Sequence, residues 1–259
     1  VAELNRRLEP AAGAPGIDAA AIDLLVEAEH DLPELALPEP DAVARSIGAH
    51  VASLVPNGGC IQTGIGVIPA AVLGALAEHN DLGLHGGLID EAGLALIERG
   101  VITGREKDLD RGVHVTGMAL GTRRLYAALA DRPDLVFRPA RYTHESSVIA
   151  ELDRFVSINS AVEVDLLGQV SSEMVSGRQI SGTGGSVDFM RGAAASPGGR
   201  SIVAMTSTAR KGELSRIVPV LQSGTAVTAA RTDVDCVVTE HGVAELKGRS
   251  VDARAEALI

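Results

Sequence analysis

The sequence predicts an α/β fold whose sheet is mainly parallel, and two observations carry this prediction. Short apolar runs bounded by Gly, Ser or Asp alternate with amphipathic segments of about ten residues, a pattern typical of parallel strands joined by helices. Hydrophobic residues form 46% of the 259 residues and charged residues 22%, which is the composition of a globular chain with a sizeable core.

The first half of the chain is predicted to alternate between helix and strand. Residues 1–40 are rich in Pro, Ala and acidic residues and indicate the end of one domain followed by a linker, so 41–259 form a second domain. Asp41 is expected to cap a helix of about fourteen residues. We expect strands at 60–63, 82–85 and 113–120, and helices at 69–79, 91–100 and 122–130.

The second half is richer in strands. They are predicted at 155–159, 162–167, 202–206, 217–220, 226–228 and 236–239. The chain begins with Val1 rather than Met, and a periodic helix is still running at Ile259. We therefore expect the sequence to be part of a longer protein.

Composition argues against several classes of function. Lys and Arg number 23 against 34 Asp and Glu, and the net charge of −11 disfavours binding to nucleic acid or to an anionic membrane. Aromatic residues form only 2% of the chain, so base stacking is not an expected binding mode. Two cysteines, no signal peptide and no apolar run of about 20 residues favour a cytoplasmic protein.

Two glycine-rich segments are candidate binding loops. The first, QTGIG at 62–66, joins a predicted strand to a helix, and the second is SGTGGSVDFMRGA at 181–193. Glycines allow a ligand to approach the backbone, and amides at a helix start can hold an anion or an oxyanion. The first segment is not GxGxxG, so it supports dinucleotide binding only weakly. A tight βα turn and a flexible surface loop are the structural alternatives.

Other familiar site patterns are missing from the sequence. It contains no HExxH, CxxC or GxSxG, and the histidines are scattered. The residues alone therefore predict an α/β protein with two glycine-lined anion or oxyanion sites and no metal.

Six collinear segments resemble the acetyl-CoA hydrolase/transferase family, a class I CoA-transferase group that includes 4-hydroxybutyrate and succinyl-CoA:acetate CoA-transferases. They are IQTGIGVIPAAVL (61–73), DLGLH (81–85), SINSAVEVDLLGQV (157–170), SGTGGSVDFMRGA (181–193), STARKGELSRIVP (207–219) and VVTEHGVAELKGRS (237–250). The resemblance implies an open α/β domain at 41–259, with 1–40 similar to the tail of a second, related domain.

The resemblance also implies a mechanism. In such enzymes a glutamate carboxylate attacks an acyl-CoA thioester, and a glutamyl-CoA thioester then passes CoA to a second carboxylic acid. Coenzyme A, an acyl-CoA and a small carboxylate are the implied ligands, and a homo- or hetero-oligomer is the implied assembly. The implied oxyanion residues are Gly64, Ile65, Gly66, Val67, Gly184 and Gly185, and the implied CoA or acyl contacts are Gln62, Asn159, Gly182, Ser186 and Asp188.

The chain departs from the family pattern at the nucleophile. The family reads H-[ST]-E-M, whereas this chain reads His85-Gly86-Gly87-Leu88, so Gly87 stands at the glutamate position. Glu91 is a candidate substitute, although a first-turn carboxylate that complements a helix dipole is the preferred interpretation.

Three functions remain open from the sequence. The first is an acyl-CoA enzyme without the usual carboxylate, using a water, direct acyl transfer or a nucleophile from elsewhere. The second is an acyl-CoA-binding protein without turnover, such as the inert half of a hetero-oligomer. The third is a structural partner of an active relative. Both glycine loops are present, which favours the first two.

Overall fold

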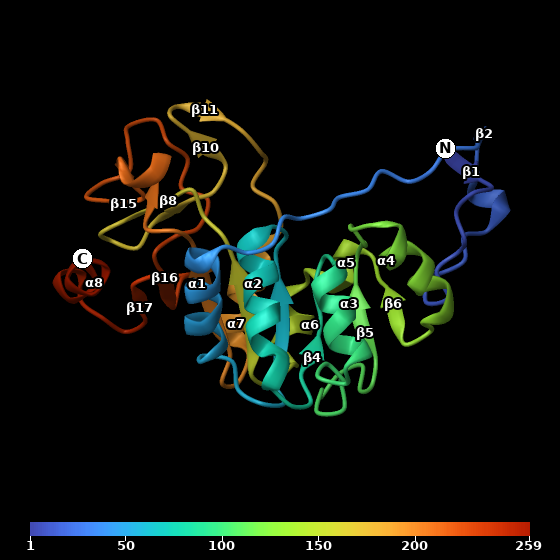
Figure 1. Cartoon of the computed structure of the whole chain (residues 1–259), viewed down its shortest axis with the longest axis horizontal. Coiled ribbons are helices and arrows are strands. Elements are labelled where there is room, and N and C mark those ends of the chain that lie inside the picture. Colours follow the sequence, from blue (N-terminus) through green and yellow to red (C-terminus); the bar gives the residue numbers. More distant parts are fainter.

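A six-stranded sheet runs through the centre of the computed structural model, which describes residues 1–259 (Figure 1). Its strand order is β17-β16-β12-β7-β3-β4, and all neighbours are parallel except β17, which is antiparallel to β16. This confirms the predicted α/β fold with a mainly parallel sheet. The strands are β3 (Cys60–Thr63), β4 (Gly83–Leu84), β7 (Phe155–Asn159), β12 (Arg200–Ala204), β16 (Cys236–Thr239) and β17 (Gly242–Glu245).

Helices cover both faces of the sheet. In Figure 1, α1 (Ala42–Ala52), α2 (Val67–Ala75) and α3 (Glu91–Glu98) lie in front, with α6 (Ser146–Ala150) and α7 (Ser186–Ala195) behind. The Asp41 side chain accepts a hydrogen bond from Ala44 N, as expected of a cap. α1 and α3 end two or three residues earlier than predicted, whereas the helices predicted at 69–79 and 122–130 end as 3₁₀ turns at Leu76–Glu78 and Leu129–Asp131.

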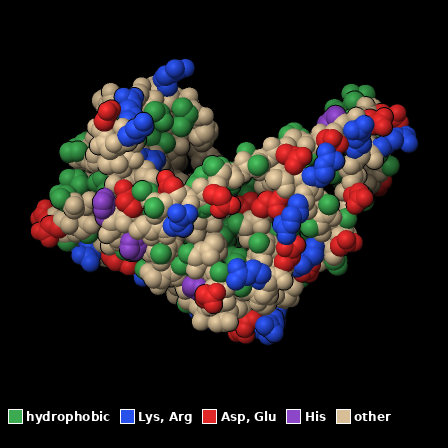
Figure 2. Space-filling model, viewed as in Figure 1, with side chains coloured by type: hydrophobic (Ala, Val, Ile, Leu, Met, Phe, Trp, Pro, Cys, Tyr) green, Lys and Arg blue, Asp and Glu red, His purple; other side chains and the backbone are tan.

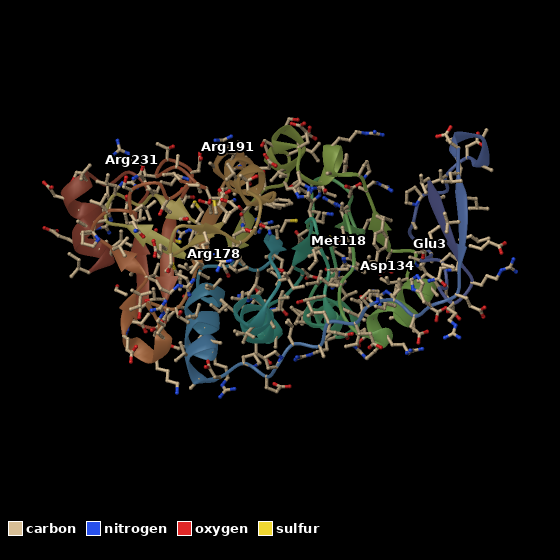
Figure 3. All side chains as sticks on the ribbon, turned by 90° about the horizontal axis from the view of Figure 1, so that it is seen from above. Glu3, Met118, Asp134, Arg178, Arg191 and Arg231 are labelled. Carbon is tan, nitrogen blue, oxygen red and sulfur yellow. The ribbon has the colours of Figure 1, made fainter.

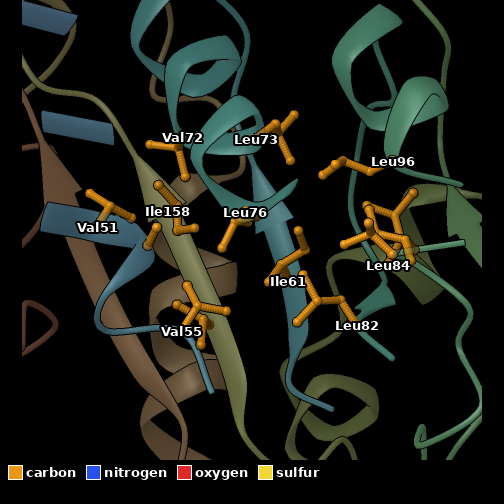
Figure 4. Close-up of a cluster of buried hydrophobic side chains, with 14 of the residues drawn as sticks. Val51, Val55, Ile61, Val72, Leu73, Leu76, Leu82, Leu84, Leu96 and Ile158 are labelled. Carbon is orange, nitrogen blue, oxygen red and sulfur yellow. The ribbon is translucent and has the colours of Figure 1, made fainter. Parts of the chain in front are cut away.

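The largest core cluster lies between the sheet and the front helices. Figure 4 shows Val51 of α1 and Val72 of α2 packed against Ile61 of β3 and Ile158 of β7. On the opposite face Phe155 packs with side chains of α6 and α7, because successive residues of β7 point to opposite faces. Both faces of β3 and β7 are therefore buried, and the polar side chains of these strands are buried with the apolar ones.

Beyond β4 the chain adds a smaller parallel pair. β5 (His114–Thr116) pairs with β6 (Leu135–Phe137), and a bridge between His85 and Val115 joins this pair to the main sheet. Two helices, α4 (Arg123–Ala128) and α5 (Ala140–Thr143), lie in the same part of the molecule.

A second group of short strands lies beyond the other edge. β15 (Ile217–Val218) and β9 (Val170–Ser171) pair with β8 (Glu163–Asp165), and α8 (Val251–Leu258) ends the chain. Two small antiparallel pairs complete the group. They are β10 (Met174–Val175) with β11 (Arg178–Gln179), and β13 (Thr208–Ala209) with β14 (Leu214–Ser215).

The strand predicted at 226–228 is wrong. Only Ala229 forms a bridge, to Val170, and the backbone N of Thr228 also donates to the carbonyl of Val170, at 2.8 Å. Ala226 N donates to Met174 Sδ, and Thr228 Oγ1 donates to Glu173. The backbone pairing is thus confined to Val170, and no ladder extends through residues 226 and 227.

Residues 1–40 lie along one side of the molecule. β1 (Ala2–Asn5) and β2 (Leu25–Ala28) pair in parallel, and the following segment runs across to α1 (Figures 1 and 3). Leu35 N donates to Gly121 O, and Tyr126 Oη donates to Pro33 O, so this segment is tied to the start of α4. Its assignment to the tail of another domain stays a prediction.

The surface is hollowed between the two ends of the molecule. Figure 2 shows this hollow in the upper outline, between the part that holds β8, β10, β11 and β15 and the part that holds α4, β1 and β2. No helix is both long and apolar enough to span a membrane.

Candidate functional site

The segment after β4 holds Gly87, which the resemblance predicts to stand at the nucleophile position. His85 and Gly86 continue beside the sheet, and Gly86 N donates to Val115 O at 3.0 Å. A Cβ added at Gly86 would meet Gln62 Cγ at 3.4 Å, so this segment packs directly against the end of β3. Gly87 therefore lies at the carboxyl edge of the parallel strands, where α/β proteins usually bind ligands.

Gln62 and Asn159 form a buried amide pair at the same edge. Gln62 Nε2 donates to Asn159 Oδ1 at 3.3 Å, and Asn159 Nδ2 donates to Gln62 Oε1 at 3.1 Å. Ser157 Oγ also donates to Gln62 Oε1, at 3.2 Å. The two predicted ligand contacts are thus neighbours, and their amide groups hydrogen-bond each other and fix the ends of β3 and β7.

His144, which follows α5, fills the space between Gly87 and the second glycine loop. A Cβ added at Gly87 would lie 2.9 Å from His144 Cε1 and 3.0 Å from Nε2. A Cβ added at Gly185 would overlap the same ring at Cδ2 and Nε2. The imidazole can occupy this place only because both neighbours lack side chains.

Two contacts hold the imidazole of His144, and a third fixes the backbone beside it. Its Nδ1 lies 2.8 Å from Thr143 Oγ1, and its ring centroid lies 4.5 Å from that of Phe189 on α7. His85 Nε2 donates to the carbonyl of Thr143 at 3.1 Å and so fixes the backbone that carries the imidazole. Burial lowers the pKa of His144 below 6.5, and the carboxylate of Asp188 opposes this shift.

The start of α7 opens into a hollow of about 530 Å³. Its seven lining residues are Ala140, His144, Glu145, Ser146, Gly184, Gly185 and Asp188. Gly185 precedes the helix without a side-chain capping bond, so the first amides of α7 are not capped by a side chain. Gly184 has φ of 63°, a conformation that favours glycine. The hollow combines helix-start amides with one imidazole.

The first glycine loop faces a different pocket. Gly66, with φ of 126°, begins α2, and Ile65 lines a pocket of about 720 Å³ between α2, α3 and the segment 35–40. Glu91 lines this pocket too. Gly64 and Val67 flank the turn, whereas Gly182 and Ser186 belong to the second loop. The oxyanion and ligand roles given to these residues stay predictions.

Glu91 is engaged in structural contacts. Its Oε1 accepts from Thr122 Oγ1 at 2.5 Å and from Leu125 N at 3.2 Å, and its Oε2 accepts from Arg124 at 2.9 Å. Burial acts to raise the pKa of Glu91, but these hydrogen bonds outweigh it and lower the pKa. The carboxylate thus caps α4, an arrangement that supports its preferred structural interpretation.

Sequence reasoning placed His144 only among the scattered histidines. Its partners, Gly87 and Gly185, lie far from it along the chain, and no local spacing joins the three. The absence of a side chain at position 87 was the available signal, since it leaves space for a neighbour. No group of three or more His, Cys, Asp or Glu residues is placed to hold a metal ion.

Comparison with known proteins places the chain in a family. The model of the acetyl-CoA hydrolase/transferase C-terminal domain matches residues 121–259. The 4-hydroxybutyrate coenzyme A transferase of Clostridium kluyveri is 45% identical over 100% of this chain and 60% of its own length.

Solved structures agree with this match. RipA from Yersinia pestis has a TM-score of 0.91 at 40% identity, covering 99% of this chain and 58% of that one. The 4-hydroxybutyrate CoA-transferase of Porphyromonas gingivalis has a TM-score of 0.85 at 38% identity, covering 99% of this chain and 60% of that one. The chain spans about 60% of the length of these relatives. It belongs to the acetyl-CoA hydrolase/transferase family.

Proposed function

We propose that the protein acts on acyl-CoA thioesters and small carboxylic acids, by CoA transfer or by hydrolysis, at a site without the family nucleophile. The main supporting observation is the hollow that the start of α7 forms with His144, whose ring lies against Gly87. Relatives named as CoA-transferases support the substrate class. Coenzyme A enters as part of the substrate, and no metal takes part.

The start of α7 suits the charge that develops during attack on a thioester. Helix-start amides carry a partial positive charge, and they stabilise an oxyanion when a carbonyl carbon becomes tetrahedral. Gly87 has no carboxylate, so a glutamyl-CoA thioester cannot form at that position. The attacking group must therefore be a water, the second substrate or another side chain.

A second candidate is a non-catalytic acyl-CoA-binding or structural subunit of a hetero-oligomeric CoA-transferase. Gly87 favours it, because a subunit paired with an active relative does not need its own nucleophile. In either case we expect a cytoplasmic homo- or hetero-oligomer that binds neither nucleic acid nor membrane.

Thiol release and calorimetry on the full-length protein test the proposal. We expect acetyl-CoA or another short acyl-CoA to bind with about −8 to −4 kcal/mol, and free CoA to appear with time. Release that depends on added acetate would indicate transfer, and release without it would indicate hydrolysis. Binding without turnover would favour the inert subunit. No binding up to millimolar acyl-CoA would contradict both candidates.

A further inference from the structure

The ring of His144 is fitted into the site by two glycines at once. Its Nε2 lies 3.0 Å from the position that a Cβ at Gly87 would take, and the ring also covers Gly185 at the start of α7. A side chain at either position would displace the imidazole. The ring of His144 can therefore lie here only because position 87 has no side chain.

We infer that His144 is the catalytic base of an acyl-CoA hydrolase reaction in this site. The inference rests on the proposed function and specifies which of its reactions occurs. An imidazole cannot copy the family's carboxylate chemistry, which passes CoA through a glutamyl thioester. It can instead remove a proton from water, and general bases of this kind contribute about 100-fold to 10,000-fold in rate.

The contacts of Nδ1 set the ring up for this role. When Nδ1–H donates to Thr143 Oγ1, the lone pair is on Nε2, the atom that faces Gly87 and Gly185. His85 donates to the carbonyl of Thr143 and holds this segment against the sheet. His85 and Thr143 are therefore positioning residues, and only His144 reaches the hollow.

The reaction balances with water as the sole co-substrate. The water oxygen bonds to the thioester carbonyl carbon while His144 Nε2 takes its proton, and the oxyanion lies against the first amides of α7. The C–S bond then breaks as the oxyanion collapses, and the imidazolium returns the proton to the leaving CoA thiolate. The products are a carboxylic acid and CoA, and the base is regenerated.

The surroundings keep this imidazole neutral near pH 7. Burial is the main cause of its lowered pKa, and Asp188 on α7 acts in the opposite direction. The other titratable groups around it are Glu145, which lines the same hollow, and His85 behind Thr143. The rate of hydrolysis should therefore fall as the pH is lowered, and the midpoint of this fall should lie below 6.5, the usual pKa of an imidazole. D188N should move this midpoint to lower pH, because the carboxylate of Asp188 raises the pKa of His144.

Acetyl-CoA hydrolysis by the full-length protein tests the inference. H144Q and H144A should lower kcat by about 100-fold or more while acetyl-CoA still binds. H241Q is the matched control, because His241 is 77% exposed beside β17, at the opposite edge of the sheet from β4. Added imidazole should restore part of the activity of H144A, since the truncated site leaves room for it. T143V should shift the pH profile, and T143S should not.

Each negative result would contradict a different statement. If the parent protein neither binds nor cleaves acetyl-CoA, the proposed function fails. If it cleaves acetyl-CoA and a folded H144Q is as active as H241Q, or if imidazole does not rescue a folded H144A, the role of His144 is overturned. An acetylated His144 peptide after rapid quenching would also overturn it, because the ring would then act as a nucleophile.

Discussion

His144 and Gly87 occupy complementary space: a Cβ at position 87 would lie 2.9 Å from His144 Cε1, closer than real Cβ contacts allow. Gly87 is not among the residues with positive φ, so its backbone accepts other amino acids. The obstacle to a side chain at this position is therefore the imidazole and not the backbone.

Restoring the family carboxylate should require removal of the imidazole. We expect G87E alone to be destabilised by roughly 1–3 kcal/mol, the typical cost of overpacking, and to transfer little CoA. G87E/H144A should form a glutamyl-CoA adduct at position 87 and show CoA transfer to acetate. Peptide mass after borohydride reduction and a coupled transfer assay measure the two effects.

H144A alone is the control for this pair, because it lacks both the base and the carboxylate. Equal adduct formation in G87E and in the double variant would contradict the steric conflict. A folded double variant that binds acyl-CoA without any adduct would mean that the oxyanion groups are no longer placed for the family reaction.

Substitution of Gly185 should reduce hydrolysis, because it too would displace the ring of His144. Gly185 has φ of −102°, which alanine tolerates, yet a methyl group there would overlap the His144 ring. G185A should fold and lose hydrolysis to the level of H144A, as measured by thiol release. G74A, whose added methyl meets nothing within 4 Å, should retain the parent rate. An active, well-folded G185A would show that the ring has another productive position.

Glu91 should matter for stability and not for chemistry. E91Q should lower the free energy of unfolding by about 1–2 kcal/mol, because the charged cap of α4 and the pair with Arg124 are lost. Urea unfolding gives the stability, and acyl-CoA turnover well below the melting temperature gives the activity. Loss of turnover in the folded variant would revive Glu91 as the substitute nucleophile.

Two buried histidines should make the fold sensitive to mild acid. Burial lowers the pKa of His85 and of His114 to about 4. Between that value and about 6.5 the unfolded chain binds more protons than the folded one, so stability falls as pH falls. Each pKa unit corresponds to about 1.4 kcal/mol.

Urea unfolding at pH values across this window measures the effect. H114Q should reduce the slope of stability against pH relative to the parent. An unchanged slope would mean that His114 titrates alike in both states.

Local patterns predicted every strand of the main sheet except the antiparallel edge strand β17. Cys60–Thr63 and Phe155–Asn159 are apolar runs between clear breaks, and each is a strand with those bounds. β5 lies within the strand predicted at 113–120. β6, β17 and the pair β10–β11 were not predicted, because they are only two to four residues long and form through tertiary pairing that no local period reports. The prediction at 226–228 failed because the backbone of this segment pairs only with Val170, and Ala226 N donates to the Met174 side chain instead.

Local sequence indicated only part of the candidate site, and the roles that the resemblance implies for its residues stay predictions. The glycine loops are visible as local sequence, because a βα turn and a helix start are built from neighbouring residues. The meeting of Gly87, His144 and Gly185 depends on three segments that only the folded sheet brings together. His144 fills the space beside Gly87, but nothing in the sequence around His144 predicts this contact.

The central place of β7 has a consequence for biosynthesis. β3 pairs with β4 on one side and with β7 on the other, and β7 is also the partner of β12. Because the ribosome delivers the chain from its amino end, β3 waits with an open edge until Phe155–Asn159 emerges. During that interval the unpaired edge of β3 can pair with strands other than β7. The β3–β7 pairing joins residues far apart in the chain, and such pairing forms slowly. A chaperone that shields nascent strand edges would therefore act on this chain before β7 is synthesised.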